Sequence, residues 1–559
     1  MTPTTKAEST PDLVAAIDRL ERESDTCYVG LRLLTHEWKF AAWLSLAECA
    51  RRLESSLTPQ QYGSGQHKII VMNLARASAQ MCKFARAHGK RSPRAPSSFR
   101  WSAQLAEEAA AAFQVAWEYS MFCVDFPAWH KNLYAAELVG AGTIRFHSGT
   151  SQLARRVSAY QKGIRPAAAQ TKHLTEEMPS PTQKLRELFE DVMRRSKARG
   201  VYRVKFGSTD RLRTELARLY AERLSGVFRR YPDISVGRYT LGQFRSFYAG
   251  LLALVSAHEH LCFLWAQSNG LPLESVNILY PRLKWIKLIA EYSGLTGTEI
   301  ESILPDLIFG DSQVQDLQVM PFVPLADDNS LLAVAPAFPL ASNWEENILR
   351  VCSYLRPTIY SETSFTKEDE MRDQLQRAIT SPRRVIGPVK LGKGVPDLDL
   401  LFEDRATQVL VLAELKWPRK PYAPREIVER DSEIRKGVSQ IKAIKKFLSA
   451  NPRFLVDRNY VAQAISEYRE VQYCVISRDH LIASDDLECP IYSYDAFEAE
   501  MASFKDTSSG LTFLNSMDWL PVEGKDYTCQ WITNRAAGVT ILSELFLLKA
   551  FGASIATSR

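Results

Sequence analysis

The sequence lacks any cysteine or histidine pattern typical of a bound metal or a disulfide framework. Its nine cysteines are scattered, odd in number and form no CxxC pair, which argues against a zinc knuckle and fits a reducing cytoplasm. His258 and His260 flank Glu259, but a spacing of two residues places them on different faces of a helix. We therefore interpret these histidines as structural.

The sequence also lacks a secretory signal, a membrane span and a strong charge. The N-terminus MTPTTKAESTPD is polar. The most apolar stretch, 249–257, is about half the length needed to span a bilayer, roughly 20 residues, and predicts a buried helix instead. The net charge of +6 is mild and permits a polyanionic partner without requiring one. We expect a soluble cytoplasmic protein with no membrane partner.

The 559 residues exceed what one hydrophobic core usually supports, so several domains are expected. The first 345 residues read as helical, beginning with apolar residues at helical spacing after the N-cap candidate at 9–12. We predict a helical domain at 1–165, a linker rich in proline, and a second helical region at 184–345. A short strand is expected at 330–334 within the second region.

The C-terminal third alternates between predicted strands and helices. This alternation indicates an α/β domain with a mixed sheet at 346–505, followed by a helical extension at 506–559. The overall class is therefore α+β and multidomain. The elements expected here are helices near 366–380, 425–449 and 538–551, and strands at 398–403, 408–415, 471–476 and 491–494.

The segment 394–417 contains most of the chemistry-bearing residues. A polar turn at 404–407 separates two apolar strands, which predicts a hairpin. Side chains alternate across a strand, so Glu414 and Lys416 share one face, as do Asp397 and Asp399. A four-residue loop would set Asp397 opposite Glu414, and a six-residue loop would set Asp399 there. We favour Asp399, because the apolar run begins directly after it.

Carboxylates converging at this density repel one another unless a cation joins them. Oxygen ligands suit Mg²⁺ or Mn²⁺, and such an ion could activate a water and stabilise charge on a phosphate oxygen. Lys416 could orient that water and neutralise the developing charge. The structural alternative is an exposed salt-bridge cluster at a strand end.

This arrangement resembles the PD-(D/E)XK nuclease superfamily over roughly residues 350–500. The matching residues are Pro396-Asp397 or Asp399, followed by Glu414-Leu415-Lys416. In that superfamily these positions bind a divalent metal and cleave phosphodiester bonds. The resemblance implies a restriction-endonuclease-like domain in which Asp397, Asp399 and Glu414 hold metal, with Asp399, Glu414 and Lys416 catalytic.

Two flanking helices add further matches to the superfamily. Glu368 is expected on the core face of the preceding helix and would be a further metal ligand; Glu362 and Glu370 are weaker candidates. The helix after the hairpin carries Gln440, which the resemblance makes a supporting catalytic residue. The residues that place Glu368 on the core face are Met371, Leu375 and Ile379, at i+3, i+7 and i+11.

The same second helix is rich in lysine and arginine. Arg435, Lys436 and Lys442 are candidate phosphate contacts, although such residues also form ordinary solvated helix faces. They make nucleic acid the expected partner, with DNA favoured because most members with this pattern cut DNA.

The sequence thus predicts a Mg²⁺- or Mn²⁺-dependent endonuclease. Its architecture resembles bacterial restriction or anti-phage systems, in which the helical region would sense a trigger, bind a partner or set a homo-oligomer. Two alternatives stay open: a catalytically silent nucleic-acid-binding or scaffold protein with this fold, and an RNA-cutting enzyme.

Overall fold

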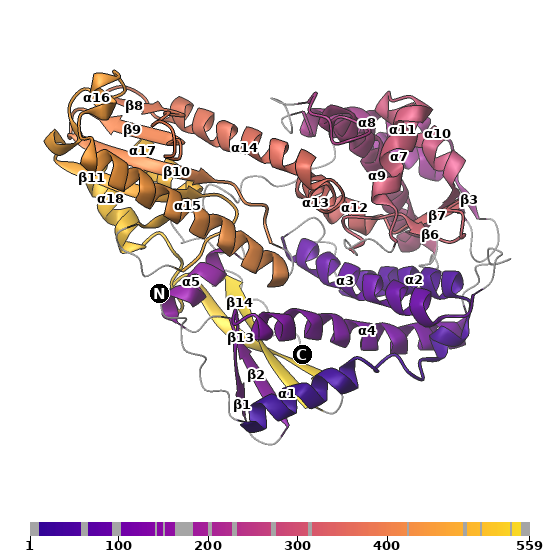
Figure 1. The fold of residues 1–559 in the computed structure, drawn as a ribbon. Helices are drawn as coiled ribbons and strands as arrows, with labels where there is room; N and C mark the ends of the chain where they lie inside the picture. The colour runs from indigo at the N-terminus through magenta and orange to yellow at the C-terminus, as the bar shows by residue number, and fades with distance from the viewer. Residues whose placement is uncertain are drawn as a thin grey trace. The chain divides into compact units, whose positions relative to one another are not determined.

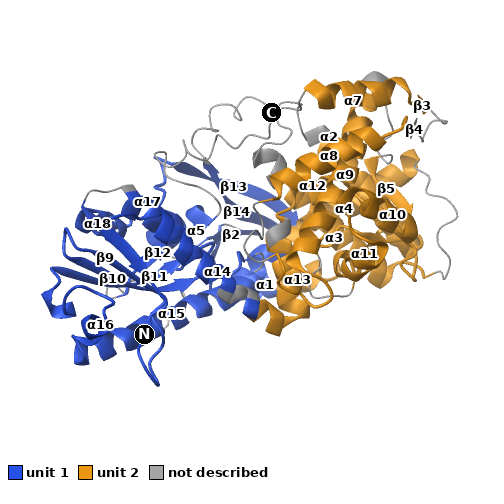
Figure 2. Ribbon diagram, turned by 90° about the horizontal axis from the view of Figure 1, so that it is seen from above, with its two compact units in different colours: residues 1–18, 123–175, 362–559 blue, residues 19–122, 176–361 orange. Residues whose placement is uncertain are grey.

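In the computed structural model the chain forms two compact units, each built from separate stretches of sequence (Figure 2). Unit 1 comprises 1–18, 123–175 and 362–559, and unit 2 comprises 19–122 and 176–361. The protein is thus a multidomain chain of helices and several sheets, as expected. The structure describes residues 11–56, 65–91, 102–139, 142–148, 151–161, 183–198, 204–225, 232–269, 276–310, 316–421, 424–483, 489–503, 506–536 and 539–548.

Unit 2 is mostly helical, and its helices pack around two apolar cores. The apolar stretch at 249–257 lies within α9 and is largely buried, as predicted. Leu241–Ala266 is long and apolar enough to cross a membrane, but 72% of its most apolar window is buried, as in the core helix of a soluble protein. The helices are α2 (Trp38–Ser56), α3 (Gly65–His88), α7 (Gln183–Arg194), α8 (Asp210–Arg223), α9 (Leu241–Asn269), α10 (Arg282–Ser293), α11 (Gly297–Ile303), α12 (Ala337–Ala341) and α13 (Trp344–Leu355), with 3-10 turns η1 (Arg32–Thr35) and η4 (Leu304–Leu307).

Unit 2 also contains short strands. The strand expected at 330–334 is confirmed as β7 (Leu331–Val334), which lies between β5 (Ile278–Pro281) and β6 (Val323–Pro324) in an antiparallel sheet. A two-stranded pair joins β3 (Lys197–Ala198) to β4 (Val204–Lys205). Helices α1 (Pro11–Ser24) and α4 (Ala103–His130) each contribute residues to both units.

The main sheet of unit 1 has five strands in the order β12-β11-β10-β9-β8. Neighbours β8, β9 and β10 run antiparallel, whereas β10, β11 and β12 run parallel, so the sheet is mixed as expected. Every position of β10 before Lys416 is buried, which is typical of a strand covered on both faces. The strands are β8 (Arg383–Ile386), β9 (Leu400–Asp404), β10 (Val409–Lys416), β11 (Glu470–Ser477) and β12 (Ile491–Ser493).

Helices pack against this sheet (Figure 1). The long α15 contacts β10 and β11, and α17 contacts β11 and β12. Apolar residues of α5 and α14 join the same core, including Tyr160, Met371 and Leu375. The helices are α5 (Gln152–Gln161), α14 (Pro357–Ala378), α15 (Pro424–Ala450), α16 (Phe454–Asp457), α17 (Tyr494–Ser503) and α18 (Thr507–Ser516), with the 3-10 turn η5 (Ile465–Glu467).

A second sheet of unit 1 corrects two predictions. The prediction of a helical extension at 506–559 with a helix near 538–551 is wrong: after α18, the described residues form strands β13 (Tyr527–Ala536) and β14 (Val539–Leu548), which pair with each other. The region 1–165, expected as helical, contains β1 (Ala135–Leu138) and β2 (Thr143–His147). The sheet order is β1-β2-β14-β13. In β14, Val539, Ile541 and Ser543 are buried and the residues between them are less buried, which is the two-residue period of a strand. The apolar composition of this segment by itself fits a buried helix as well, and this is why the prediction failed.

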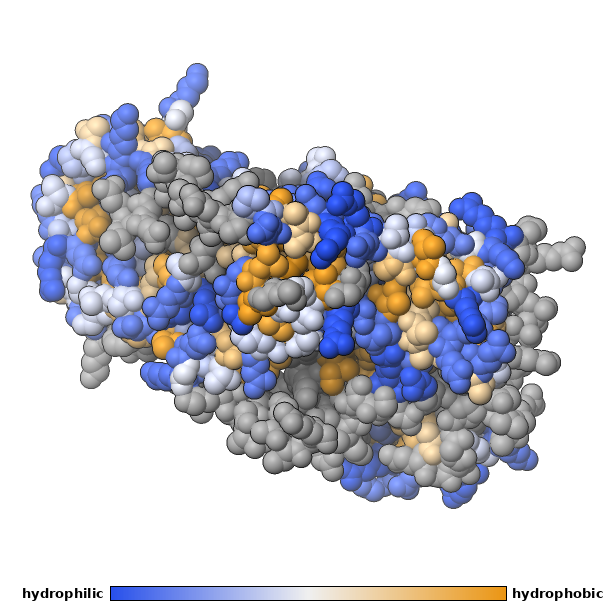
Figure 3. Space-filling model, turned by 90° about the horizontal axis from the view of Figure 1, so that it is seen from below, coloured by the Kyte–Doolittle hydropathy of each residue, from blue (hydrophilic) through white to orange (hydrophobic). Residues whose placement is uncertain are grey.

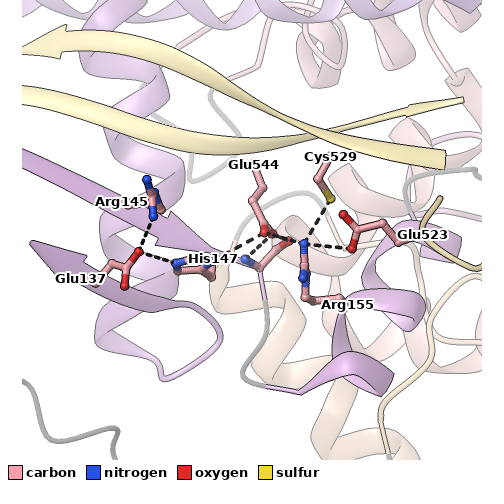
Figure 4. A network of polar contacts seen from close by, with 8 residues as sticks. Glu137, Arg145, His147, Arg155, Glu523, Cys529 and Glu544 are labelled. Atoms are coloured by element: carbon pink, nitrogen blue, oxygen red, sulfur yellow. Dashed lines mark hydrogen bonds and ion pairs between the residues drawn. The ribbon is translucent and has the colours of Figure 1, made fainter. Parts of the chain in front are cut away.

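A network of polar contacts joins β14 and the residues before β13 to the end of β2 and to α5 (Figure 4). The carboxylate of Glu544 on β14 accepts hydrogen bonds from the backbone and hydroxyl of Ser148 at 2.9 and 2.6 Å. Arg155 of α5 lies 3.2 Å from both Glu544 and Glu523. The segments 143–155 and 523–544 are therefore joined by charge as well as by strand pairing.

Large hydrophobic side chains that are exposed among the described residues are dispersed through the sequence. They are Val29, Val139, Leu283, Leu355, Val428 and Trp531. On the face shown in Figure 3, hydrophobic groups lie among hydrophilic ones. Single exposed hydrophobic residues are ordinary and indicate no binding surface by themselves.

Candidate functional site

The candidate site lies where β9 begins and β10 ends. The pairing of Leu400 with Ala413 places Asp399 next to Glu414 at the following position. Opposed residues of an antiparallel pair point to the same face, so the favoured register is the one observed. The loop length expected for this register, six residues, is wrong: the loop has four residues, 405–408, and it gives Asp399 rather than Asp397 because it begins one residue later than the predicted turn at 404–407.

The backbone around Asp399 is held closely. Leu415 N–H donates to Asp399 Oδ2 at 3.0 Å. At Gly387 an added Cβ would lie 2.2 Å from the carbonyl oxygen of Asp399, so only glycine fits there. Arg372 of α14 donates to the same carbonyl at 3.5 Å. Asp399 is thus fixed by the strands and by α14.

Glu414 and Lys416 point toward α15. Lys416 Nζ donates to Glu414 Oε1 at 2.6 Å, and Glu414 is only 2% exposed. A Cβ at Gly437 of α15 would lie 3.1 Å from Lys416 Cε and 3.4 Å from Glu414 Cγ. A glycine inside a helix costs about 1 kcal/mol relative to alanine. Its presence here lets α15 approach the catalytic candidates closely.

Glu368 of α14 belongs to the same electrostatic cluster. Burial raises the pKa of Glu368 to about 7; Lys416 opposes that rise, and the negative charge of Asp399 adds to it. The core-face prediction for this helix is confirmed, because Met371, Leu375 and Ile379 are all buried.

The cluster holds more carboxyl groups than its one lysine can pair with. Burial raises the pKa of Glu414 to about 8, and Asp399 adds to the rise, while Lys416 opposes it. Burial alone would lower the pKa of Lys416, but Glu414, Glu368 and Asp399 together raise it above its ordinary value. One ammonium faces three carboxyl groups, so a second cation would be stabilised here.

Two oxygens of the cluster have no hydrogen-bond partner among the described residues. They are Glu414 Oε2 and Gln440 Oε1, and both atoms are buried. Gln440 lies on α15 three residues after Gly437, the residue that contacts Lys416. Buried acceptors normally bind a donor, water or ion. Gln440 Oε1 could therefore accept a hydrogen bond from a water, whereas the Glu414 carboxyl also meets Asp399, with which it can share either a proton or a cation.

Several predicted residues lie outside this cluster. Asp397 is exposed, and no contact in the described part of the chain joins it to Asp399, Glu414 or Lys416. Glu362 is also exposed. Glu370 accepts a hydrogen bond from Gln374 at 3.2 Å instead.

The three basic candidates of α15 are exposed but do not share one face. With 3.6 residues per turn, Lys436 lies one turn before Gln440 on the same edge of the helix. Arg435 and Lys442 point away from the face that packs on the sheet. The structure therefore brings Lys436 nearest to the candidate site.

Sequence reasoning missed the residues that surround Lys416. The indole N–H of Trp417 donates to Asp479 Oδ2 at 2.6 Å, and its ring lies 4.3 Å from the Arg478 guanidinium and 4.8 Å from Lys367 Nζ. The backbone N–H of Arg478 donates to the backbone carbonyl of Lys416 at 2.9 Å. No local pattern in the sequence indicated these contacts, because they join β10 to residues that follow the distant strand β11.

The carboxylate oxygens of this cluster are chemically suited to bind a hard divalent cation. Carboxylate oxygens are the ligands that Mg²⁺ and Mn²⁺ prefer, and the unpartnered Glu414 Oε2 is one of them. As the side chains stand, no group of three or more His, Cys, Asp or Glu residues within the described ranges is gathered closely enough to hold a metal. Glu414 Oε1 binds Lys416 instead, so the side chains would have to rearrange for a metal to bind.

Comparison with known proteins adds no relative to this picture. No protein-family model, curated protein or solved structure matches the chain.

Proposed function

We propose that unit 1 is a metal-dependent nuclease that hydrolyses phosphodiester bonds, with DNA as the favoured substrate. The observation that carries the proposal is the gathering of three carboxyl groups around Lys416, with two buried oxygens that no donor within the described residues satisfies. Its second support is the resemblance of the Asp399, Glu414 and Lys416 pattern to the PD-(D/E)XK superfamily. The order of helices and strands in the mixed sheet agrees with a restriction-endonuclease-like domain.

Each residue would have a distinct role. Asp399, Glu414 and Glu368 would hold Mg²⁺ or Mn²⁺, which when bound supplies positive charge to the phosphate and acidifies a water. Lys416 Nζ would orient the attacking water and stabilise negative charge as it develops on the phosphate. Gln440 Oε1 would accept a hydrogen bond from the same water. Asp397 is not assigned a role, because it is exposed and outside the cluster.

The test is cleavage of supercoiled plasmid, single-stranded DNA and RNA by the full chain, with Mg²⁺, Mn²⁺ or EDTA. Lys416→Ala and Glu414→Gln should each reduce the metal-dependent rate by about 10²-fold or more. Lys390→Ala is the matched control, since Lys390 is an exposed lysine of the same unit. Its rate should match wild type.

The other outcomes decide between the alternatives. Cutting of RNA alone would change the substrate and keep the site. Cutting that survives Lys416→Ala would place the site elsewhere. Nucleic-acid binding without cutting, under every metal and substrate, would favour the silent binding or scaffold protein.

A restriction or anti-phage role extends the proposal to unit 2, which would sense a trigger or set an oligomer. Unit 1 includes Val157 and Tyr160 in its core, so a fragment limited to 346–505 would lack part of that core. The full chain should therefore be assayed with and without extract from phage-infected cells. An unchanged rate and oligomeric state would remove the support for regulation.

A further inference from the structure

Trp417, the residue directly after Lys416, is held by side chains from two other segments of unit 1. Its indole N–H donates to Asp479 Oδ2 at 2.6 Å. The Arg478 guanidinium lies 4.3 Å from the centre of its ring, and Lys367 Nζ of α14 lies 4.8 Å from it. A cation over an aromatic ring is attracted by the ring quadrupole, so three separate contacts fix this indole.

The turn that supplies two of these contacts is itself constrained. Asp479 follows β11 and has a φ of +67°, a conformation that few non-glycine residues adopt. Such a conformation persists where the surrounding structure holds it. The hydrogen bond from the Trp417 indole is one contact that holds Asp479 here.

Arg478 also joins the end of β10 to the helix that carries Glu368. Gln374 Oε1 of α14 accepts a hydrogen bond from the guanidinium at 3.0 Å, and the Tyr494 ring of α17 lies 4.9 Å from it. Gln374 follows Glu368 by six residues, about 9 Å of helix. The backbone N–H of the same arginine donates to the Lys416 carbonyl. One arginine therefore connects α14, α17 and the end of β10.

Trp417 meets Glu368 through its backbone as well. Burial raises the pKa of Glu368 to about 7, and the charge of Lys416 and a hydrogen bond from the Trp417 backbone N–H oppose that rise. Lys367, whose ammonium lies against the indole ring, directly precedes Glu368 on α14 and is 3% exposed. Trp417 thus contacts the segment that carries Glu368 and is bonded to Lys416.

These contacts favour a role inside the protein over contact with a substrate. The side chain is half-buried, its N–H already donates, and two cations lie against its ring. An aromatic ring that stacks on a nucleic-acid base presents an open face. The polar groups around Trp417 are instead arranged to keep it in one position.

We propose that Trp417 is a positioning residue of the nuclease site: its indole, anchored by Asp479 and Arg478, fixes the end of β10 against α14, so that Lys416 and Glu368 keep the spacing that the metal and the attacking water need. This inference rests on the proposed nuclease function, because it takes these two residues to be the reacting and metal-binding groups. Residues that orient metal ligands and catalytic groups affect both metal affinity and rate.

The experiment measures Mn²⁺ binding to the full chain, through the electron paramagnetic resonance signal of free Mn²⁺, and cleavage of DNA in Mg²⁺. Trp417→Leu should weaken the Mn²⁺ binding that Glu414→Gln abolishes by about tenfold. It should lower kcat by about 10²-fold and leave KM for DNA unchanged. Trp417→Phe keeps a ring beside the two cations and loses the donor N–H, so it should cost only about tenfold in kcat.

Trp531→Leu is the matched control. Trp531 also lies against a guanidinium, that of Arg145 at 4.9 Å, but it belongs to β13 in the second sheet of unit 1. Its substitution should change neither Mn²⁺ binding nor kcat. Far-UV circular dichroism should match wild type for each variant, and Trp417→Phe provides the test if Trp417→Leu does not fold.

The outcomes separate the positioning role from the nuclease function. Unchanged Mn²⁺ binding and kcat in both Trp417 variants would overturn the positioning role even if the protein cuts DNA. A raised KM at unchanged kcat would make Trp417 a substrate contact and would also overturn it. Weaker Mn²⁺ binding in Trp417→Leu, largely recovered in Trp417→Phe, in a protein that cuts no nucleic acid would keep the positioning role and end the nuclease proposal.

Discussion

The two ends of the β9–β10 hairpin each bury a glutamate, and the surroundings of the two differ. At the loop end, Glu403 accepts hydrogen bonds from Arg384, Arg405, Tyr468 and Ala462 N–H. At the other end, Glu414 accepts a hydrogen bond from Lys416, and its second oxygen has no donor among the residues that the structure describes. Both side chains are almost fully buried, so burial alone does not explain the difference.

The electrostatic consequence is opposite at the two ends. Burial would raise the pKa of Glu403, but hydrogen bonds from Tyr468, Ala462 and Arg384 outweigh it and lower that pKa. Burial and Asp399 raise the pKa of Glu414 to about 8. A buried charge that serves stability is fully partnered, whereas one that serves binding keeps unsatisfied capacity. The comparison identifies Glu403 as a partnered structural residue and supports the role proposed for Glu414.

The largest expected effect is on stability at the loop end. Glu403→Gln should lower the free energy of unfolding by about 3 kcal/mol, because it leaves two arginines beside a neutral group. Since the folded-state pKa of Glu403 is lowered, this loss should shrink as pH falls below 4.5. Urea unfolding at pH 7 and pH 4 measures it. Glu414→Gln is the matched variant, and an equal loss there would contradict the comparison.

Glu259 of α9 tests whether every unpartnered buried carboxylate is functional. Burial raises its pKa to about 8, and its Oε1 has no partner among the described residues. The folded state keeps this proton up to about pH 8, whereas the unfolded chain releases it near 4.5, so stability falls as pH rises between those values.

Glu259→Gln should therefore stabilise the chain by about 2 kcal/mol at pH 8.5 and by little at pH 5. Thermal unfolding at the two pH values measures the difference. The exposed Glu301→Gln in the same unit should change neither value. A destabilised Glu259→Gln variant at pH 8.5 would indicate that the glutamate binds a group of its own.

A smaller effect on the free energy of unfolding is expected when a cation binds at the end of the hairpin opposite its loop, where Asp399 and Glu414 lie. Mg²⁺ at ten times its dissociation constant should stabilise the wild type by about 1.4 kcal/mol. Asp399→Asn and Glu414→Gln should lose this gain in thermal unfolding. Glu370→Gln, on α14 but outside the cluster, should retain it. An equal gain in all variants would place the bound cation elsewhere.

The smallest effect on stability is expected at Gly437. Gly437→Ala should change the free energy of unfolding by less than about 1 kcal/mol, because better helix propensity offsets crowding against Lys416. The nuclease rate should nevertheless fall about tenfold, since the lysine must move. Unfolding and cleavage assays on one preparation test this. An unchanged rate would mean that Lys416 is not held in a catalytic position.

The sequence alone predicted four of the five strands of the main sheet, β9 to β12, and the two helices α14 and α15, but it missed β8. It also placed Glu414 and Lys416 together on one face at the end of β10. Strand periodicity and the long apolar run of β10 are local features, so residue order is enough to predict them. The same holds for Glu368, whose face follows from helical spacing with Met371 and Leu375.

Only the tertiary structure decided which acids meet and what surrounds them. Both Asp397 and Asp399 fit the superfamily pattern and the apolar run favoured Asp399, but only the pairing register across the loop at 405–408 placed Asp399 opposite Glu414. The pairing of β14 with β2 joins residues almost 400 positions apart, which no local period encodes. The contact of Arg478 with Trp417 likewise depends on a parallel strand pair. Such contacts between distant segments arise from packing, and local sequence patterns do not specify them.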